Sequence, residues 1–97
     1  MATYIVLSSF TDQGVRSVKD TTKRADAVRE LAKKFGVTAK EIFWTLGRHD
    51  VVAIFEAPDD ASMTALGLAL GAAGNVRTQT LRAFSREEMN GVLAKLA

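Results

Sequence analysis

The stretch Leu46-Gly47-Arg48-His49-Asp50-Val51-Val52 decides the fold of this chain. It joins two runs, residues 39–46 and 50–57, whose length and content of β-branched and aromatic side chains are typical of strands. A short connection that contains glycine favours a β-hairpin, so we predict two adjacent antiparallel strands. Gly47 is expected to hold a positive φ in the turn, because glycine adopts that backbone conformation without a steric cost.

The segments before the hairpin predict a strand and a helix. Residues 3–10 are short and rich in β-branched and aromatic side chains, which favours a first strand. A turn at residues 11–14 leads into a short helical segment that ends near Lys19. From Thr22 the apolar residues Val28, Leu31, Ala32 and Phe35 follow the spacing of one helix face. Gly36 then supplies the helix stop.

The segments after the hairpin continue the alternation. The carboxylates that follow Pro58 can cap a helix over residues 61–73, and residues 75–84 alternate as a fourth strand. Ser85-Arg86-Glu87-Glu88 has the pattern of a capping box, which opens a last helix with Met89, Val92, Leu93 and Leu96 on one face. The order is βαββαβ plus a C-terminal helix. It predicts a ferredoxin-like α+β fold, in which two helices cross one face of a four-stranded antiparallel sheet.

Length and composition indicate one small soluble domain. The 97 residues are enough for a single core, so we predict one domain over residues 1–97. The chain is 47% hydrophobic and 25% charged, which is typical of globular proteins. Apolar runs are shorter than the roughly 20 residues of a membrane span, and residues 1–10 lack the basic start of a signal peptide. We therefore expect a cytoplasmic protein that does not contact a membrane.

The charged and metal-binding side chains exclude several classes of function. The 13 basic and 11 acidic residues nearly cancel, so the uncompensated basic surface of a nucleic-acid-binding protein is not expected. The chain has no cysteine and one histidine, which excludes disulfides and zinc-thiolate sites. We therefore predict no nucleic-acid partner, no metal site and no cofactor.

The predicted strands are apolar on both faces. In the first strand Ile5 and Leu7 alternate with the apolar Tyr4 and Val6, and the third strand alternates in the same way. Two helices can cover only one face, so the sequence predicts that the other packs on a second copy, in a homodimer or higher homo-oligomer. The alternative is that the last helix, about 18 Å long, covers part of this face. The helix at 61–73 is apolar almost all round and is expected to be buried on all sides.

Segments spread along the chain resemble the GYD domain family. They are Tyr4-Ile5, Ser9-Phe10-Thr11-Asp12-Gln13-Gly14, Gly47-Arg48-His49-Asp50-Val51-Val52, Glu56-Ala57-Pro58-Asp59, Gly74-Asn75-Val76-Arg77-Thr78 and Thr80-Leu81-Arg82-Ala83-Phe84. The resemblance covers nearly the whole chain and implies a dimeric α+β barrel of bacterial type. That superfamily includes cofactor-independent monooxygenases, isomerases, haem enzymes and ligand sensors, so it implies no single activity. The family motif usually has tyrosine where this chain has His49.

Six residues are candidates for a functional site. His49 beside Asp50 can act as a general base with an orienting carboxylate, can contact a ligand, or can be a turn residue whose neighbour caps the backbone. Trp44 can form the wall of an apolar pocket on an uncovered sheet face, or can pack in the core or an interface. Thr78, Thr80 and Arg82 share one face of the fourth strand, where they can bind a carboxylate or phosphate. The alternative for the arginine is an ion pair between subunits.

These observations favour a small-molecule-binding GYD domain protein that assembles with itself. One alternative is a cofactor-independent monooxygenase or isomerase that acts on a small apolar or aromatic acid, with His49 as the proton acceptor. A second alternative is a structural or regulatory oligomerisation module. The sequence by itself does not decide whether the protein is an enzyme.

Overall fold

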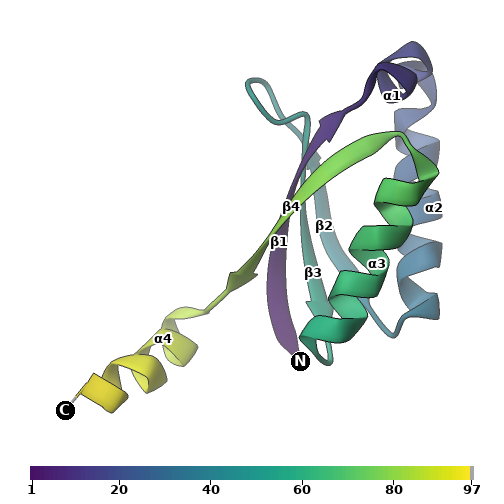
Figure 1. Cartoon of the computed structure of the whole chain (residues 1–97). Helices are drawn as coiled ribbons and strands as arrows, with labels where there is room; N and C mark the ends of the chain where they lie inside the picture. The colour runs from purple at the N-terminus through teal and green to yellow at the C-terminus, as the bar shows by residue number, and fades with distance from the viewer. Residues whose placement is uncertain (97) are drawn as a thin grey trace.

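The computed structural model describes residues 1–96 and confirms the ferredoxin-like α+β fold. The elements follow one another in the predicted order, with two short 3₁₀ segments added (Figure 1). They are β1 (Ala2–Phe10), α1 (Asp12–Arg16), η1 (Val18–Asp20), α2 (Thr21–Lys34), β2 (Thr38–Trp44), β3 (Val51–Ala57), α3 (Asp60–Ala73), β4 (Val76–Ala83), α4 (Arg86–Leu93) and η2 (Ala94–Leu96).

The sheet is antiparallel, with the strand order β2-β3-β1-β4. At its centre Ile5 of β1 lies between Ile54 of β3 and Leu81 of β4. Helices α2 and α3 lie side by side on one face of this sheet (Figure 1). β4 is an edge strand next to α3, and a cleft lies between these two elements.

The core lies between the sheet and the two helices. Its fully buried side chains include Phe55 of β3, Met63 and Leu66 of α3, and Val37 before β2. Tyr4 and Val6 of β1 lie on the same side, whereas their neighbours in the strand point to the opposite face. That opposite face, which we call the open face, carries the apolar side chains of Ile5, Leu7, Phe43, Val52, Ile54 and Leu81. The side chains of Phe43 and Leu81 are 51% and 40% exposed.

The β2–β3 hairpin forms as predicted, with Gly47 at a φ of +126°. β2 ends at Trp44 rather than at Leu46, which lies exposed in the turn. The carboxylate of Asp50 accepts a hydrogen bond of 2.8 Å from the backbone N–H of Phe10. The backbone N–H of Asp50 donates to the carbonyl of Ser8, also at 2.8 Å. The hairpin is therefore tied to the end of β1.

The expectation that helix α3 is buried on all sides is wrong. Met63 and Leu66 are buried against the sheet, but Leu68 on the outer side is 71% exposed. A methyl group added at Gly67 or Gly71 would have no neighbour within 4 Å. Part of the apolar surface of this helix therefore remains exposed in the single chain.

The C-terminal arm, residues 84–96, extends away from the body of the domain (Figure 1). It begins with the predicted capping box, in which the Ser85 hydroxyl accepts from the Glu88 N–H and the Glu88 carboxylate accepts from the Ser85 N–H. The alternative in which the last helix covers the open face is wrong for this chain, because α4 projects outward with Leu93 and Leu96 exposed.

Candidate functional site

A cleft of about 450 Å³ lies between α3 and β4. Its lining residues come from three elements: Tyr4 of β1; Asp60, Met63, Thr64, Gly67 and Leu68 of α3; and Thr78, Thr80 and Arg82 of β4. The three β4 residues face the cleft together because side chains two positions apart point to the same side of a strand. Tyr4 is the partner of Arg82 in the β1–β4 register, which brings its ring to the same place.

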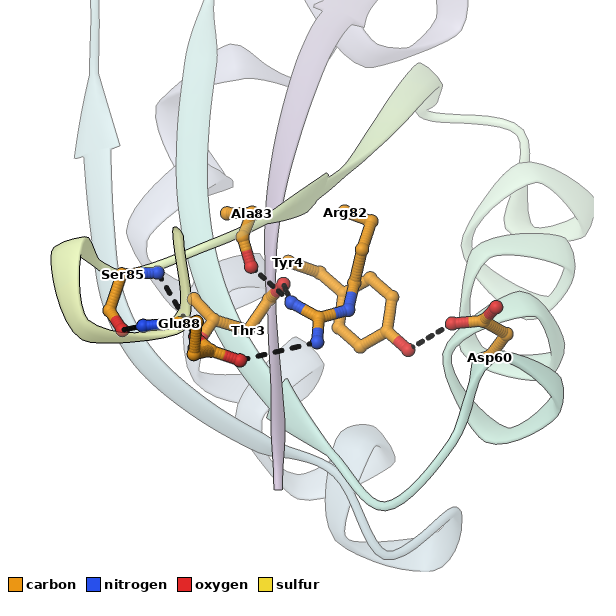
Figure 2. A network of polar contacts seen from close by, with 7 residues as sticks. All are labelled: Thr3, Tyr4, Asp60, Arg82, Ala83, Ser85 and Glu88. Atoms are coloured by element: carbon orange, nitrogen blue, oxygen red, sulfur yellow. Dashed lines mark hydrogen bonds and ion pairs between the residues drawn. The ribbon is translucent and has the colours of Figure 1, made fainter. Parts of the chain in front are cut away.

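Tyr4 and Asp60 connect the sheet to the first turn of α3. The Tyr4 hydroxyl donates a short hydrogen bond to the Asp60 carboxylate (Figure 2). This hydrogen bond, together with burial of the ring, raises the pKa of Tyr4 above its ordinary value. The phenol therefore keeps its proton at neutral pH and acts in the cleft as a hydrogen-bond donor.

Arg82 is held in place by the backbone and by two rings. Its Nη1 group donates to the carbonyl of Thr3 at 3.4 Å and to the carbonyl of Ala83 (Figure 2). Its guanidinium carbon lies 5.8 Å from the centre of the Tyr4 ring and 4.5 Å from that of Phe84, which are cation–π distances. One third of the Arg82 side chain remains exposed. The guanidinium is thus positioned by the fold and still accessible.

Glu88 links Arg82 to the C-terminal arm. Its carboxylate lies 3.4 Å from Nη2 of Arg82 and also accepts the N–H of Ser85 in the capping box at 3.0 Å. The hydrogen bond from the Ser85 backbone is the main cause that lowers the pKa of Glu88, and Arg82 contributes. The carboxylate is therefore ionised at neutral pH.

Three hydroxyl groups in the cleft have no hydrogen-bond partner among residues 1–96. Among residues 1–96, no side-chain hydrogen bond involves Thr64, Thr78 or Thr80. The cleft therefore combines a guanidinium, a carboxylate and unpaired hydroxyls. These are hydrogen-bonding groups suited to a small polar molecule.

The structure separates the six predicted site residues into two groups. Thr78, Thr80 and Arg82 come together in the cleft, on one face of β4 as the sequence indicated. Trp44 does not lie on the uncovered sheet face as expected, and that expectation is wrong. It lies on the helix side of β2, where its indole N–H donates to the hydroxyl of Thr21 at 2.9 Å. Phe43 occupies the open face instead.

His49 and Asp50 do not form the predicted pair of base and carboxylate. Within the described chain, the Asp50 carboxylate accepts from the backbone of Phe10, and no hydrogen bond joins it to the imidazole. The His49 carbonyl accepts from the hydroxyl of Thr45 at 2.6 Å, and the ring atom Nδ1 is buried without a partner. Both residues therefore fit the turn interpretation, and neither lines the cleft between α3 and β4.

Similarity to known proteins places the chain in a family. Residues 4–93 match the family model of the GYD domain. The chain belongs to the GYD domain family. A relative from Thermus thermophilus is 38% identical over 85 residues, which cover 87% of this chain and 90% of the relative. That relative is named "Glutamine synthetase and cystathionine beta-lyase binding protein".

Six cleft residues of this GYD domain were not among the predicted site residues: Tyr4, Asp60, Met63, Thr64, Gly67 and Leu68. The sequence indicates Tyr4 as part of an alternating strand and of the GYD resemblance, and Asp60 as one of two carboxylates at a helix start. The contact between them joins residues 56 positions apart. No local sequence signal indicates such a contact.

Residues 1–96 of this GYD domain also lack two further features. No group of three or more histidine, cysteine, aspartate or glutamate side chains is arranged to hold a metal ion there. In the same part of the chain, no helix is long and apolar enough to cross a membrane.

Proposed function

We propose that this GYD domain is a binding protein rather than an enzyme, that it acts as a homo-oligomer, and that it binds a metabolic enzyme. The observation that carries the proposal is the open face, whose apolar side chains are covered by no helix within residues 1–96. Contiguous apolar patches of this kind mark interaction surfaces in soluble proteins. The proposed first occupant of the open face is a second copy of the chain.

The shape of the open face supports this occupant. Two antiparallel sheets pack well face to face, and a two-fold axis brings the same patch of both copies together. Four strands about 4.8 Å apart and seven to nine residues long cover roughly 500 Å² in projection. A stable interface buries about 800 Å² of accessible surface per partner. The exposed apolar side chains of the arm, among them Met89, Leu93 and Leu96, offer additional area.

Binding of an enzyme is supported by the relative from Thermus thermophilus, whose name describes it as binding glutamine synthetase and cystathionine β-lyase. The high coverage of both chains makes a shared mode of action a reasonable inference. The arrangement around His49 gives the alternative of a monooxygenase or isomerase less support, because the ring lacks an orienting carboxylate.

Self-association is tested by light scattering coupled to size-exclusion chromatography. The wild-type protein should elute with at least twice the chain mass of 10.5 kDa. Leu81→Glu should shift the mass toward the monomer, because it places a charge within the apolar open face. Val15→Glu is the matched control, since Val15 is 54% exposed on α1, away from the open face. A monomeric wild-type protein at micromolar concentration would refute the self-association proposal.

Enzyme binding is tested with purified glutamine synthetase and cystathionine β-lyase immobilised on a biosensor. We expect saturable binding of the wild-type domain to at least one of them. Leu93→Glu places a charge on the exposed side of the arm. Weaker binding of this variant would assign the contact to the arm, and unchanged binding would assign it to the domain body. Absence of binding to both enzymes would contradict this part of the proposal.

Small-molecule binding is a second candidate function. The specific observation in its favour is the cleft between α3 and β4, where Arg82, Asp60 and three unpaired threonine hydroxyls surround a space of about 450 Å³. This volume lies within the range of about 300–1,000 Å³ that is usual for small-molecule sites. The two functions are compatible, because the cleft lies on the helix side of the sheet and the open face on the other.

A further inference from the structure

We propose that the cleft between α3 and β4 binds a free amino acid, with its carboxylate on Arg82 and its ammonium group on Asp60. The inference rests on the small-molecule binding proposed above and adds the chemical class of the ligand. It also assigns a role to each charged group of the cleft.

Arg82 retains the donors that a carboxylate needs. An arginine has five N–H groups, and three hydrogen bonds hold this one, two from Nη1 and one from Nη2. The N–H of Nε and the second N–H of Nη2 have no hydrogen-bond partner among residues 1–96. A guanidinium that offers two donors side by side binds a carboxylate in a bidentate manner. Because the bonds to Thr3 and Ala83 fix the guanidinium, little side-chain freedom is lost on binding.

Asp60 selects against a ligand that carries negative charge alone. One oxygen of its carboxylate accepts the Tyr4 hydroxyl, and the other has no hydrogen-bond partner among residues 1–96. A simple anion bound to Arg82 would be repelled by this carboxylate at short range. A ligand that also carries an ammonium group gains a second charge-assisted hydrogen bond instead. The cleft therefore favours a zwitterion.

The spacing of the two charged groups suits an amino acid. Both are arranged around the same phenol ring: the guanidinium carbon lies 5.8 Å from the centre of the Tyr4 ring, and Asp60 is bonded to its hydroxyl (Figure 2). The space between them therefore lies alongside one tyrosine side chain. A carboxylate and an ammonium group on one carbon atom bridge this space when each makes a hydrogen bond of about 2.8 Å.

The rest of the cleft would surround the amino-acid side chain. Thr64, Thr78 and Thr80 present hydroxyl groups, while Met63 and Leu68 present apolar surface. A hydroxyl can donate or accept, so it satisfies an amide or another hydroxyl without a charge. The cleft should therefore prefer uncharged side chains that form hydrogen bonds over charged ones.

The experiment is isothermal titration calorimetry of the full chain with each of the twenty amino acids. The tightest binder is then compared with two analogues, one without the ammonium group and one with the carboxylate converted to an amide. We expect each analogue to bind about 10- to 100-fold more weakly, which is the usual effect of one hydrogen bond between charged groups.

Variants test the two roles separately. Arg82→Met and Asp60→Asn should each weaken binding about 10- to 100-fold, and the asparagine can still accept the Tyr4 hydroxyl. Arg16→Met and Asp26→Asn are matched controls on exposed faces of α1 and α2, and they should bind like the wild type. Light scattering of each variant checks that assembly is unchanged.

The outcomes separate this inference from the proposal on which it rests. If the analogue without the ammonium group binds as tightly as the amino acid, the ligand class is wrong, whereas small-molecule binding stands. If Arg82→Met and Asp60→Asn bind like the wild type, the assigned cleft is wrong. If no amino acid and no analogue produces a binding isotherm, both the ligand class and small-molecule binding at this site are overturned.

Discussion

Replacement of Gly14 by alanine tests how α1 is packed on the body of the domain. Gly14 is buried in α1, and its α-carbon faces the backbone just before β4. A Cβ atom at this position would lie 2.1 Å from the carbonyl oxygen of Asn75 and 3.0 Å from its carbonyl carbon. The same oxygen accepts the backbone N–H of Thr11 at 3.1 Å. The φ of Gly14 is not positive, so its backbone conformation does not require glycine. Glycine is required here because a side chain would have no space.

The size of the effect follows from the displacement. Ordinary contacts of a Cβ atom begin at 3.4 Å, so α1 must move by about 1 Å. That shift weakens the two hydrogen bonds that Thr11 donates, to the carbonyls of Asn75 and Gly74, each worth about 1 kcal/mol. Overpacking typically costs about 1–3 kcal/mol. We expect a total loss of about 2–4 kcal/mol in the free energy of unfolding. For a domain of this size the melting temperature should fall by roughly 10–25 °C.

The assay is thermal and urea unfolding followed by circular dichroism at one fixed protein concentration, because self-association changes apparent stability. Gly71→Ala is the matched control. A Cβ atom there has no neighbour within 4 Å, so alanine should stabilise α3 by about 0.5–1 kcal/mol. A Gly14→Ala protein that melts at or above the wild-type temperature would refute the packing argument.

Three further predictions follow from single residues. Gly47→Val should lower the free energy of unfolding in urea by about 1–2 kcal/mol through backbone strain alone, because φ is +126° and the space around the residue is open; an unchanged midpoint would contradict this. The raised pKa of Tyr4 means that the folded state holds the phenol proton more tightly than the unfolded state. The stabilisation that this proton gives the folded state is therefore complete below about pH 10 and is lost as pH rises through the raised pKa. Tyr4→Phe should reduce the fall in melting temperature at alkaline pH, and an equal fall in both proteins would contradict this. His49→Ala should leave amino-acid affinity in calorimetry unchanged, because His49 does not line the cleft; lost binding would place the ligand elsewhere.

The order and type of the elements could be predicted because local interactions set them. Gly36 and Gly47 have positive φ, as expected of a helix stop and a hairpin turn. Ser85 and Glu88 form the capping box that their spacing indicated. The shared face of Thr78, Thr80 and Arg82 follows from the two-residue period of a strand. Each of these features depends on residues only a few positions apart.

Only the tertiary structure decides which face of each strand and helix is buried. Alternation divides a strand into two sets of side chains, but it does not say which set meets the helices. For this reason Trp44 was expected on the uncovered face, whereas it contacts Thr21 of α2. The same limit applies to α3, because its apolar composition does not distinguish Leu66, which the chain buries, from Leu68, which stays exposed.

The candidate site is also a product of tertiary structure. The sequence by itself determined the βαββαβ order, the hairpin at Gly47 and the arginine and threonines of β4 that share a face. Only the folded chain brings Arg82 over the face of the Tyr4 ring and Asp60 to its hydroxyl, through the β1–β4 register and the position of α3. The physical reason is the range of the interactions. Hydrogen bonds within a turn or a cap are encoded by neighbours, whereas the packing of a helix on a sheet depends on the whole core.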